Sequence, residues 1–210
     1  MIVTALLASR LRANLRVGLI TTTRFPREIL EDLSKFGIDT ERLMKEGSFR
    51  IADWYTCVTG RMPLTPPEDM PPSLKVGDLG IIASKEWHSG KGLRPESDPN
   101  FIEMAVLDNV TRLFRYNEEN ECVKFLYTTI ARTKQDGRVG LYGFATGVLD
   151  PRTYHDLESM FDGILDIKVS ELSTERHTVI RVRSFPDTQY TAEWYEVKIQ
   201  AGLPSLTPVV

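Results

Sequence analysis

Residues 17–37 read VGLITTTRFPREILEDLSKFG, and this stretch decides the fold class. Its first part, VGLITT, is a short apolar run with β-branched residues, which is typical of a strand buried on both faces. Pro26 follows and suits the first turn of a helix, and Gly37 suits its C-terminal cap. The apolar face of that helix consists of Ile29, Leu30, Leu33 and Phe36. A buried strand that leads into an amphipathic helix predicts an α/β unit with a parallel sheet.

The same alternation continues on both sides of this stretch. One further predicted helix opens the chain and has Val3, Leu7, Leu11 and Leu15 on its apolar face. Two others span Thr40–Lys45 and Glu118–Lys134, and a fourth begins at Asp150-Pro151. Further predicted strands span Phe49–Ala52, Phe101–Leu107 and Val139–Ala145. The last predicted strands, with no helix between them, are Ile164–Val169, Val179–Val182 and Tyr195–Ile199. The pattern therefore predicts a three-layer α/β fold whose sheet is mostly parallel with an antiparallel C-terminal edge. We expect one domain over residues 1–200 and a tail over residues 201–210.

Composition excludes several classes of protein. The 210 residues carry a net charge of −3, which gives no electrostatic support for general nucleic-acid binding. The apolar runs are too short to cross a bilayer. Cys57 and Cys122 lack metal-ligand spacing, so we expect them to be buried small side chains in a reduced, cytoplasmic protein. His88, His155 and His177 are scattered and are not expected to bind a metal.

In an open α/β sheet, ligands bind beyond the carboxyl ends of the strands. That rule selects Thr21–Arg24, Asp108-Asn109 and Thr146-Gly147. An apolar strand that ends in Asp108 has the form of a Walker B carboxylate, which holds the Mg²⁺ of a bound nucleotide. The alternative is a helix N-cap, which the motif alone favours. The phosphate loop GxxxxGK[ST] that should accompany a Walker B carboxylate is missing from the sequence.

Four stretches also carry a family resemblance. They are ALLASRLRANLRVGLITTTRFPREILEDLSKFGIDTERLMKEGSFRIAD (residues 5–53), AVLDNVTRLFRYNEENECVKFLYTTIARTKQDG (105–137), GVLDPRTYHDLESMFDGILDIKV (147–169) and VIRVRSFPDTQYTAEWYEVKI (179–199). In order and spacing they resemble the KaiC-like branch of the RecA-type ATPases, in particular its archaeal single-domain members. The resemblance implies a RecA-like P-loop NTPase fold in which the first strand and the phosphate loop are missing. It further implies that the strand beside Val17–Thr22 loses a neighbour, which leaves an exposed edge or a gap for a partner to fill.

The departures from the family concern its chemistry. Its phosphate loop would end just before Ala5, where Thr4 matches a magnesium-binding hydroxyl and Val3 replaces the phosphate-binding lysine. Its paired catalytic glutamates fall at Thr23 and Arg24. Its trans-acting lysine and arginine fall at Ser184 and Pro186, with Arg183 beside them as the remaining interface candidate.

The resemblance thus leaves a degenerate nucleotide site of Thr4, Thr23, Arg24, Asp108 and Asn109. Asp108 would bind a metal only if a magnesium nucleotide binds. We expect no catalytic residues, no ATPase activity and no cofactor, because neither the triphosphate charge nor the attacking water has its usual partner.

Three functional hypotheses follow. The first is a regulatory or scaffold subunit that pairs with itself or with a KaiC/RecA-like paralogue, in signal transduction as the family suggests. The second is an ATP- and Mg²⁺-binding ATPase whose phosphate loop lies upstream of a misassigned start. The third is a binding module whose Pro-rich loop, Gly60–Ser73, is the partner surface.

Overall fold

The computed structural model describes residues 2–59, 71, 73–80, 101–172, 175–186, 188–200 and 203–209. Most of the Pro-rich loop, including residues 60–70, lies outside the described residues, as does His88. The helices are α1 (Ile2–Arg12), α2 (Pro26–Lys35), α3 (Thr40–Lys45), α4 (Trp54–Thr59), the 3-10 helix η3 (Val110–Arg115), α6 (Glu119–Gln135) and α7 (Pro151–Glu158). None of the described helices combines the length and apolar character needed to cross a membrane.

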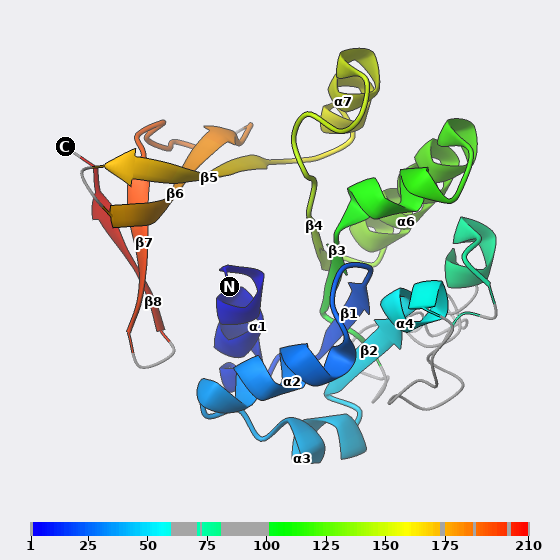
Figure 1. Cartoon of the computed structure of the whole chain (residues 1–210), viewed down its shortest axis with the longest axis horizontal. Coiled ribbons are helices and arrows are strands. Elements are labelled where there is room, and N and C mark those ends of the chain that lie inside the picture. The colour runs from blue at the N-terminus through cyan, green and yellow to red at the C-terminus, as the bar shows by residue number, and fades with distance from the viewer. Residues whose placement is uncertain are drawn as a thin grey trace.

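Sheet A forms the centre of the molecule (Figure 1). Its strands, in the spatial order β2-β1-β3-β4, are β2 (Phe49–Asp53), β1 (Val17–Thr21), β3 (Met104–Asp108) and β4 (Val139–Tyr142). All of its neighbouring pairs are parallel. β1 is buried along its whole length, as its unbroken apolar run predicts.

Helices cover both faces of sheet A, which confirms the predicted layered α/β fold. On one face, the alternate residues Leu19, Ile51 and Val106 pack with side chains of α1, α2 and α3. On the other face, Ile20 and Leu107 pack with side chains of α6. The period of two along the strands therefore divides the core into two apolar clusters, one on each side of the sheet.

Local signals in the sequence place the helix ends correctly. Asp150 caps α7, since its carboxylate accepts a hydrogen bond of 2.9 Å from the backbone N–H of Arg152, and Pro151 is the first helical residue. α2 begins at Pro26 and is followed by Gly37, whose φ of +73° explains why glycine ends that helix. The predicted helix Glu118–Lys134 is α6, and its buried residues are Cys122, Phe125, Leu126, Ile130 and Thr133.

Strand β1, at the predicted Val17–Thr22, has a neighbouring strand on each side. β1 pairs with β2 on one side and with β3 on the other, in register from Val17 to Thr21. β3 in turn pairs directly with β4. Because both edges of β1 are hydrogen-bonded to parallel neighbours, this strand presents no open edge.

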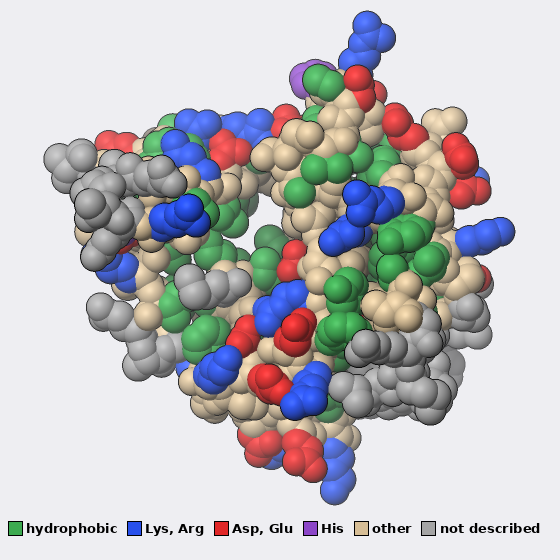
Figure 2. Space-filling model, viewed as in Figure 1, with side chains coloured by type: hydrophobic (Ala, Val, Ile, Leu, Met, Phe, Trp, Pro, Cys, Tyr) green, Lys and Arg blue, Asp and Glu red, His purple; other side chains and the backbone are tan. Residues whose placement is uncertain are grey.

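The C-terminal strands are antiparallel, as predicted, but they form a second sheet of their own and not the expected edge of sheet A. Sheet B contains β5 (Ile164–Leu172), β6 (Glu175–Ser184), β7 (Tyr195–Gln200) and β8 (Leu203–Pro208), in that spatial order. β8 pairs with β7 from Leu203 to Pro208, so these residues continue the sheet. Sheet B lies at one side of the molecule and contacts α1 through β8 (Figure 1). The space-filling view shows an open gap between sheet B and the rest of the chain (Figure 2).

Candidate functional site

Three strand ends meet at the carboxyl edge of sheet A. Thr21 at the end of β1 is in register with Asp53 at the end of β2 and with Asp108 at the end of β3. Neighbouring strands lie about 4.8 Å apart, and residues in register across parallel strands point to the same face. The two aspartates therefore flank Thr21 on one face of the sheet. This is the edge at which parallel α/β sheets bind ligands.

Asp108 is half-buried, and its carboxylate has no hydrogen-bond donor within the described ranges. Burial raises the pKa of Asp108, and the positive charge of Arg24 opposes that shift. A Cβ added to Gly143 would lie 3.2 Å from Oδ1 of Asp108, so a glycine there gives this carboxylate room.

The N-cap role falls to Asn109 and not to Asp108. Oδ1 of Asn109 accepts a hydrogen bond of 2.7 Å from the backbone N–H of Thr111, which begins the turn of η3. The peptide bond between Asp108 and Asn109 is cis. Since the following turn takes its cap from Asn109, the carboxylate of Asp108 is left without that structural task.

The hydroxyl of Thr22 holds the backbone of Asn109 on both sides. Oγ1 of Thr22 donates to the carbonyl oxygen of Asn109 at 2.7 Å and accepts from its N–H at 2.6 Å. The backbone N–H of Thr22 also donates to the carbonyl oxygen of Asp108 at 2.9 Å. Thr22 is 1% exposed, so these bonds are shielded from water. One buried threonine thus fixes the end of β3 against the end of β1.

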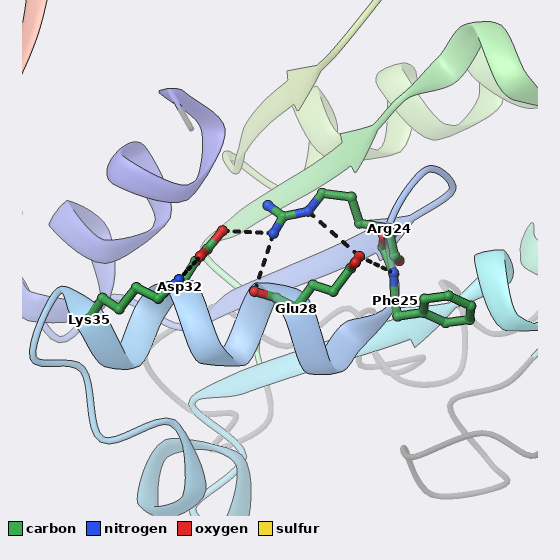
Figure 3. Close-up of polar contacts among 6 residues, drawn as sticks. Arg24, Phe25, Glu28, Asp32 and Lys35 are labelled. Carbon is green, nitrogen blue, oxygen red and sulfur yellow. Dashed lines mark hydrogen bonds and ion pairs between the residues drawn. The ribbon is translucent and has the colours of Figure 1, made fainter.

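Arg24 is tied to helix α2 (Figure 3). Its Nη2 atom donates to Oδ2 of Asp32 at 2.7 Å and to the carbonyl oxygen of Glu28 at 3.2 Å. Its Nε atom lies 4.0 Å from Oε2 of Glu28. Hydrogen bonds from Lys35 and from Arg24 lower the pKa of Asp32. The position that the resemblance assigns to a carboxylate base is therefore filled by a paired cation, which cannot accept a proton.

Of the other predicted site residues, Thr23 lies between Thr22 and Arg24 in the chain, whereas Thr4 and Arg183 lie on α1 and β6. Thr23 is half-buried, and no donor or acceptor in the described ranges bonds its hydroxyl. Thr4 is buried in α1. Arg183 lies on β6 in sheet B, where it pairs with Glu158 and, at 3.1 Å, with Asp166. Within the described residues, no hydrogen bond or ion pair joins Thr4 or Arg183 to Asp108. The structure thus brings together Arg24, Asp108 and Asn109 from the predicted set.

Asp53 is a site residue that sequence reasoning missed. Its side chain is fully buried, and Oδ1 accepts a hydrogen bond of 2.9 Å from the backbone N–H of Thr56 in α4. Its Oδ2 atom is buried with no hydrogen-bond partner in the described residues. Burial raises the pKa of Asp53 against the effect of the bonds from Thr56. The signal was present in the sequence, since Asp53 follows an apolar strand just as Asp108 does.

The side chains present fit a magnesium nucleotide only in part. Asp108 offers an oxygen ligand of the kind that Mg²⁺ prefers. Arg24 contributes positive charge near this carboxylate, and it is already paired with Asp32. The described residues contain no cluster of three or more His, Cys, Asp and Glu that could hold a metal by itself. Within the described residues, no lysine forms a hydrogen bond or an ion pair with Asp108.

The aromatic side chains near this edge serve packing. Trp54, at the start of α4, is fully buried, and its ring lies 5.4 Å from the ring of Tyr116 in an edge-on arrangement. The ring of Tyr55 packs edge-on against Phe25 at 4.8 Å. Trp54 and Tyr55 are therefore packing residues of the core and its edge.

Comparisons with known proteins bear on the fold. No family model matches the chain, and no curated protein matches its sequence. Among solved structures, the chain is similar to an uncharacterized protein from Pyrococcus horikoshii, crystallised in complex with an unknown peptide. The TM-score is 0.73 at 18% identity, covering 100% of this chain and 86% of that one. It is also similar to a KaiC-like protein from the same organism, with a TM-score of 0.65 at 17% identity over 95% of this chain and 80% of that one. The chain therefore has a KaiC-like, RecA-type α/β fold.

Proposed function

We propose that this chain is a non-catalytic protein of the KaiC/RecA-like type, which acts by binding as a regulatory or scaffold subunit. The observation that carries the proposal is the state of Arg24. A guanidinium that is paired with Asp32 and Glu28 lies at the end of β1, where a nucleotide-hydrolysing site of this type places a glutamate. A group that stays protonated cannot position or deprotonate an attacking water.

The environment of Asp108 supports the same proposal. Its raised pKa reflects burial that disfavours a charged carboxylate, whereas a magnesium site needs the charged form. Its neighbours Thr22 and Asn109 are already engaged in fixing the strand ends. The remaining groups of the site therefore include, among the described residues, none that we assign to binding a triphosphate.

The partner in this proposal is a second copy of the chain or a KaiC/RecA-like paralogue. Signal transduction is the setting that the family resemblance suggests, and the two cysteines without metal-ligand spacing favour a reduced, cytoplasmic compartment. We assign no cofactor, and we assign Thr4 and Thr23 no chemical role. Arg183 contributes to a partner interface only if it exchanges its internal ion pairs for external ones.

Calorimetric titration of the purified protein with Mg²⁺-ATP tests the proposal. We expect no binding tighter than about 1 mM, which corresponds to about −4 kcal/mol. The matched control is Asp108→Asn, which removes the candidate metal ligand and should give the same trace. Micromolar binding that Asp108→Asn abolishes would overturn the proposal and favour the alternative, an ATP-binding KaiC-like ATPase.

A further inference from the structure

Strand β5 is the edge of sheet B. It spans nine residues, pairs with β6 along one side, and has no strand along its other side in the described part of the chain. Its alternate residues Leu165, Ile167 and Val169 are 46%, 48% and 62% exposed. Edge strands offer unpaired backbone N–H and C=O groups, and natural proteins usually protect long apolar ones. β5 is therefore an open pairing surface.

The sequence of β5 is complementary to itself. In an antiparallel pair of two β5 strands centred on Ile167, Ile167 faces its own copy and Leu165 faces Val169 of the other strand. These three apolar residues share one face of the strand. On the opposite face, Asp166 of each strand lies opposite Lys168 of the other. Cross-strand apolar pairs and pairs of opposite charge both stabilise antiparallel sheets.

Other registers lack this complementarity. Centring the pair on Asp166 places that carboxylate opposite its own copy, and centring it on Lys168 does the same with the ammonium group. Like charges directly opposite each other are destabilising. Charge therefore favours the register centred on Ile167 over its nearest alternatives.

The internal contacts of the two charged residues leave the edge of β5 open. Asp166 pairs with Arg181 at 2.9 Å and with Arg183 at 3.1 Å, both on the neighbouring strand β6. Nζ of Lys168 lies 4.1 Å from the ring centre of Trp194. These partners belong to the same molecule, and the two arginines lie on β6 of the same sheet. They hold the charges in place and do not occupy the backbone groups of the free edge.

We propose that two copies of this chain associate through antiparallel pairing of their β5 strands, centred on Ile167. The twofold axis passes between the two Ile167 residues, so the same surface is used by both copies. Sheet B then runs continuously through both molecules, and the exposed apolar row of each β5 gains a cross-strand neighbour. The inference deepens the self-association part of the proposed function by naming its surface, and it holds whether or not nucleotide binds.

The contact is a single pair of strands, which is smaller than a standard protein interface of about 1,600 Å². We therefore expect a reversible dimer with a dissociation constant of about 1–100 μM. Sedimentation equilibrium over a concentration series measures it. Ile167→Lys and Lys168→Glu should each weaken the dimer at least about tenfold, the first by two like charges at the axis and the second by acidic pairs with Asp166.

The matched control for charge is Lys45→Glu on α3, which makes the same charge change away from β5 and should leave the dimer unchanged. Circular dichroism checks that each variant keeps its secondary structure. A wild-type protein that stays monomeric up to about 500 μM, or a dimer that neither β5 variant weakens, would overturn the proposal.

Cysteine cross-linking tests the register directly. The Cα atoms of Ile167 and its copy would lie about 4.5–5.5 Å apart, within reach of a disulfide bond. Ile167→Cys should therefore form a covalent dimer under mild oxidation. Leu165→Cys should not, because its own copy lies about 13 Å away along the strands. Equal cross-linking of both variants, or of neither, would contradict the proposed pairing. Calorimetry with Mg²⁺-ATP on the same samples separates the outcomes, since nucleotide binding refutes the proposed function and leaves the dimer standing.

Discussion

Removing the hydroxyl of Thr22 gives the sharpest test of how the carboxyl edge is held together. Thr22→Val keeps the shape of the side chain and deletes both of its bonds to the backbone of Asn109. Each lost hydrogen bond costs about 1 kcal/mol, and a buried polar group left without a partner costs about 1–3 kcal/mol. We therefore expect the free energy of unfolding to fall by about 2–4 kcal/mol.

The assay is urea unfolding followed by tryptophan fluorescence, to which the buried Trp54 contributes, and, independently, by circular dichroism. The midpoint should fall while the slope m stays the same, because the surface exposed on unfolding is unchanged. Thr23→Val is the matched control. It makes the same substitution one residue away at a hydroxyl with no bond in the described residues, and should change stability by less than about 0.5 kcal/mol.

Thr22→Ser separates the hydroxyl from the methyl group. It keeps the hydrogen-bonding oxygen and loses one buried methyl, which should cost about 1 kcal/mol. The reasoning would be refuted if Thr22→Val were no more destabilising than Thr23→Val, or if Thr22→Ser were as destabilising as Thr22→Val.

Three further predictions concern other charged or reactive groups. Burial raises the pKa of Asp53, so the native protein binds more protons than the unfolded chain above pH 3.8, and stability falls as pH rises through that range. Asp53→Asn should remove this part of the pH dependence, which urea unfolding at a series of pH values would show by a flatter profile. Arg183→Ala should lower the free energy of unfolding by only about 0.5–1 kcal/mol, since the ion pairs of Arg183 with Glu158 and Asp166 are partly exposed. Urea unfolding measures this loss of stability, and sedimentation shows whether an interface between copies is lost as well. Burial raises the pKa of Cys122 to about 12, so a thiol reagent should modify Cys122 only in denaturant, whereas modification in the native protein would contradict its burial.

Local signals in the sequence predicted the elements well because their causes are local. Pro26 and Asp150 mark helix starts through backbone geometry and capping, which need only neighbouring residues. The apolar run of β1 predicted a strand covered on both faces, since no other placement buries all of its side chains. These parts of the fold follow from a few residues each.

Strand pairing could not be predicted in the same way. The direct contact of β3 with β4 and the separation of the C-terminal strands into sheet B depend on partners far apart in the sequence. An apolar pattern predicts that a strand is buried, but it does not predict which strand lies beside it. The fit of Arg24 to Asp32 is a similar case, because it requires the chain to turn from β1 into α2 before the two charges meet.

Asp53 and Asp108 show why the candidate site also needed the structure. Both follow apolar strands, both are in register with Thr21, and burial raises the pKa of both carboxyl groups. Their side chains differ in hydrogen bonding, since the carboxylate of Asp53 caps α4 through Thr56 and the carboxylate of Asp108 receives no donor from the described residues. A buried carboxylate without a structural partner carries a desolvation cost that the fold does not recover. Asp108→Asn should therefore be tolerated better than Asp53→Asn in urea unfolding at neutral pH, and the opposite order would show that Asp108 has a structural role.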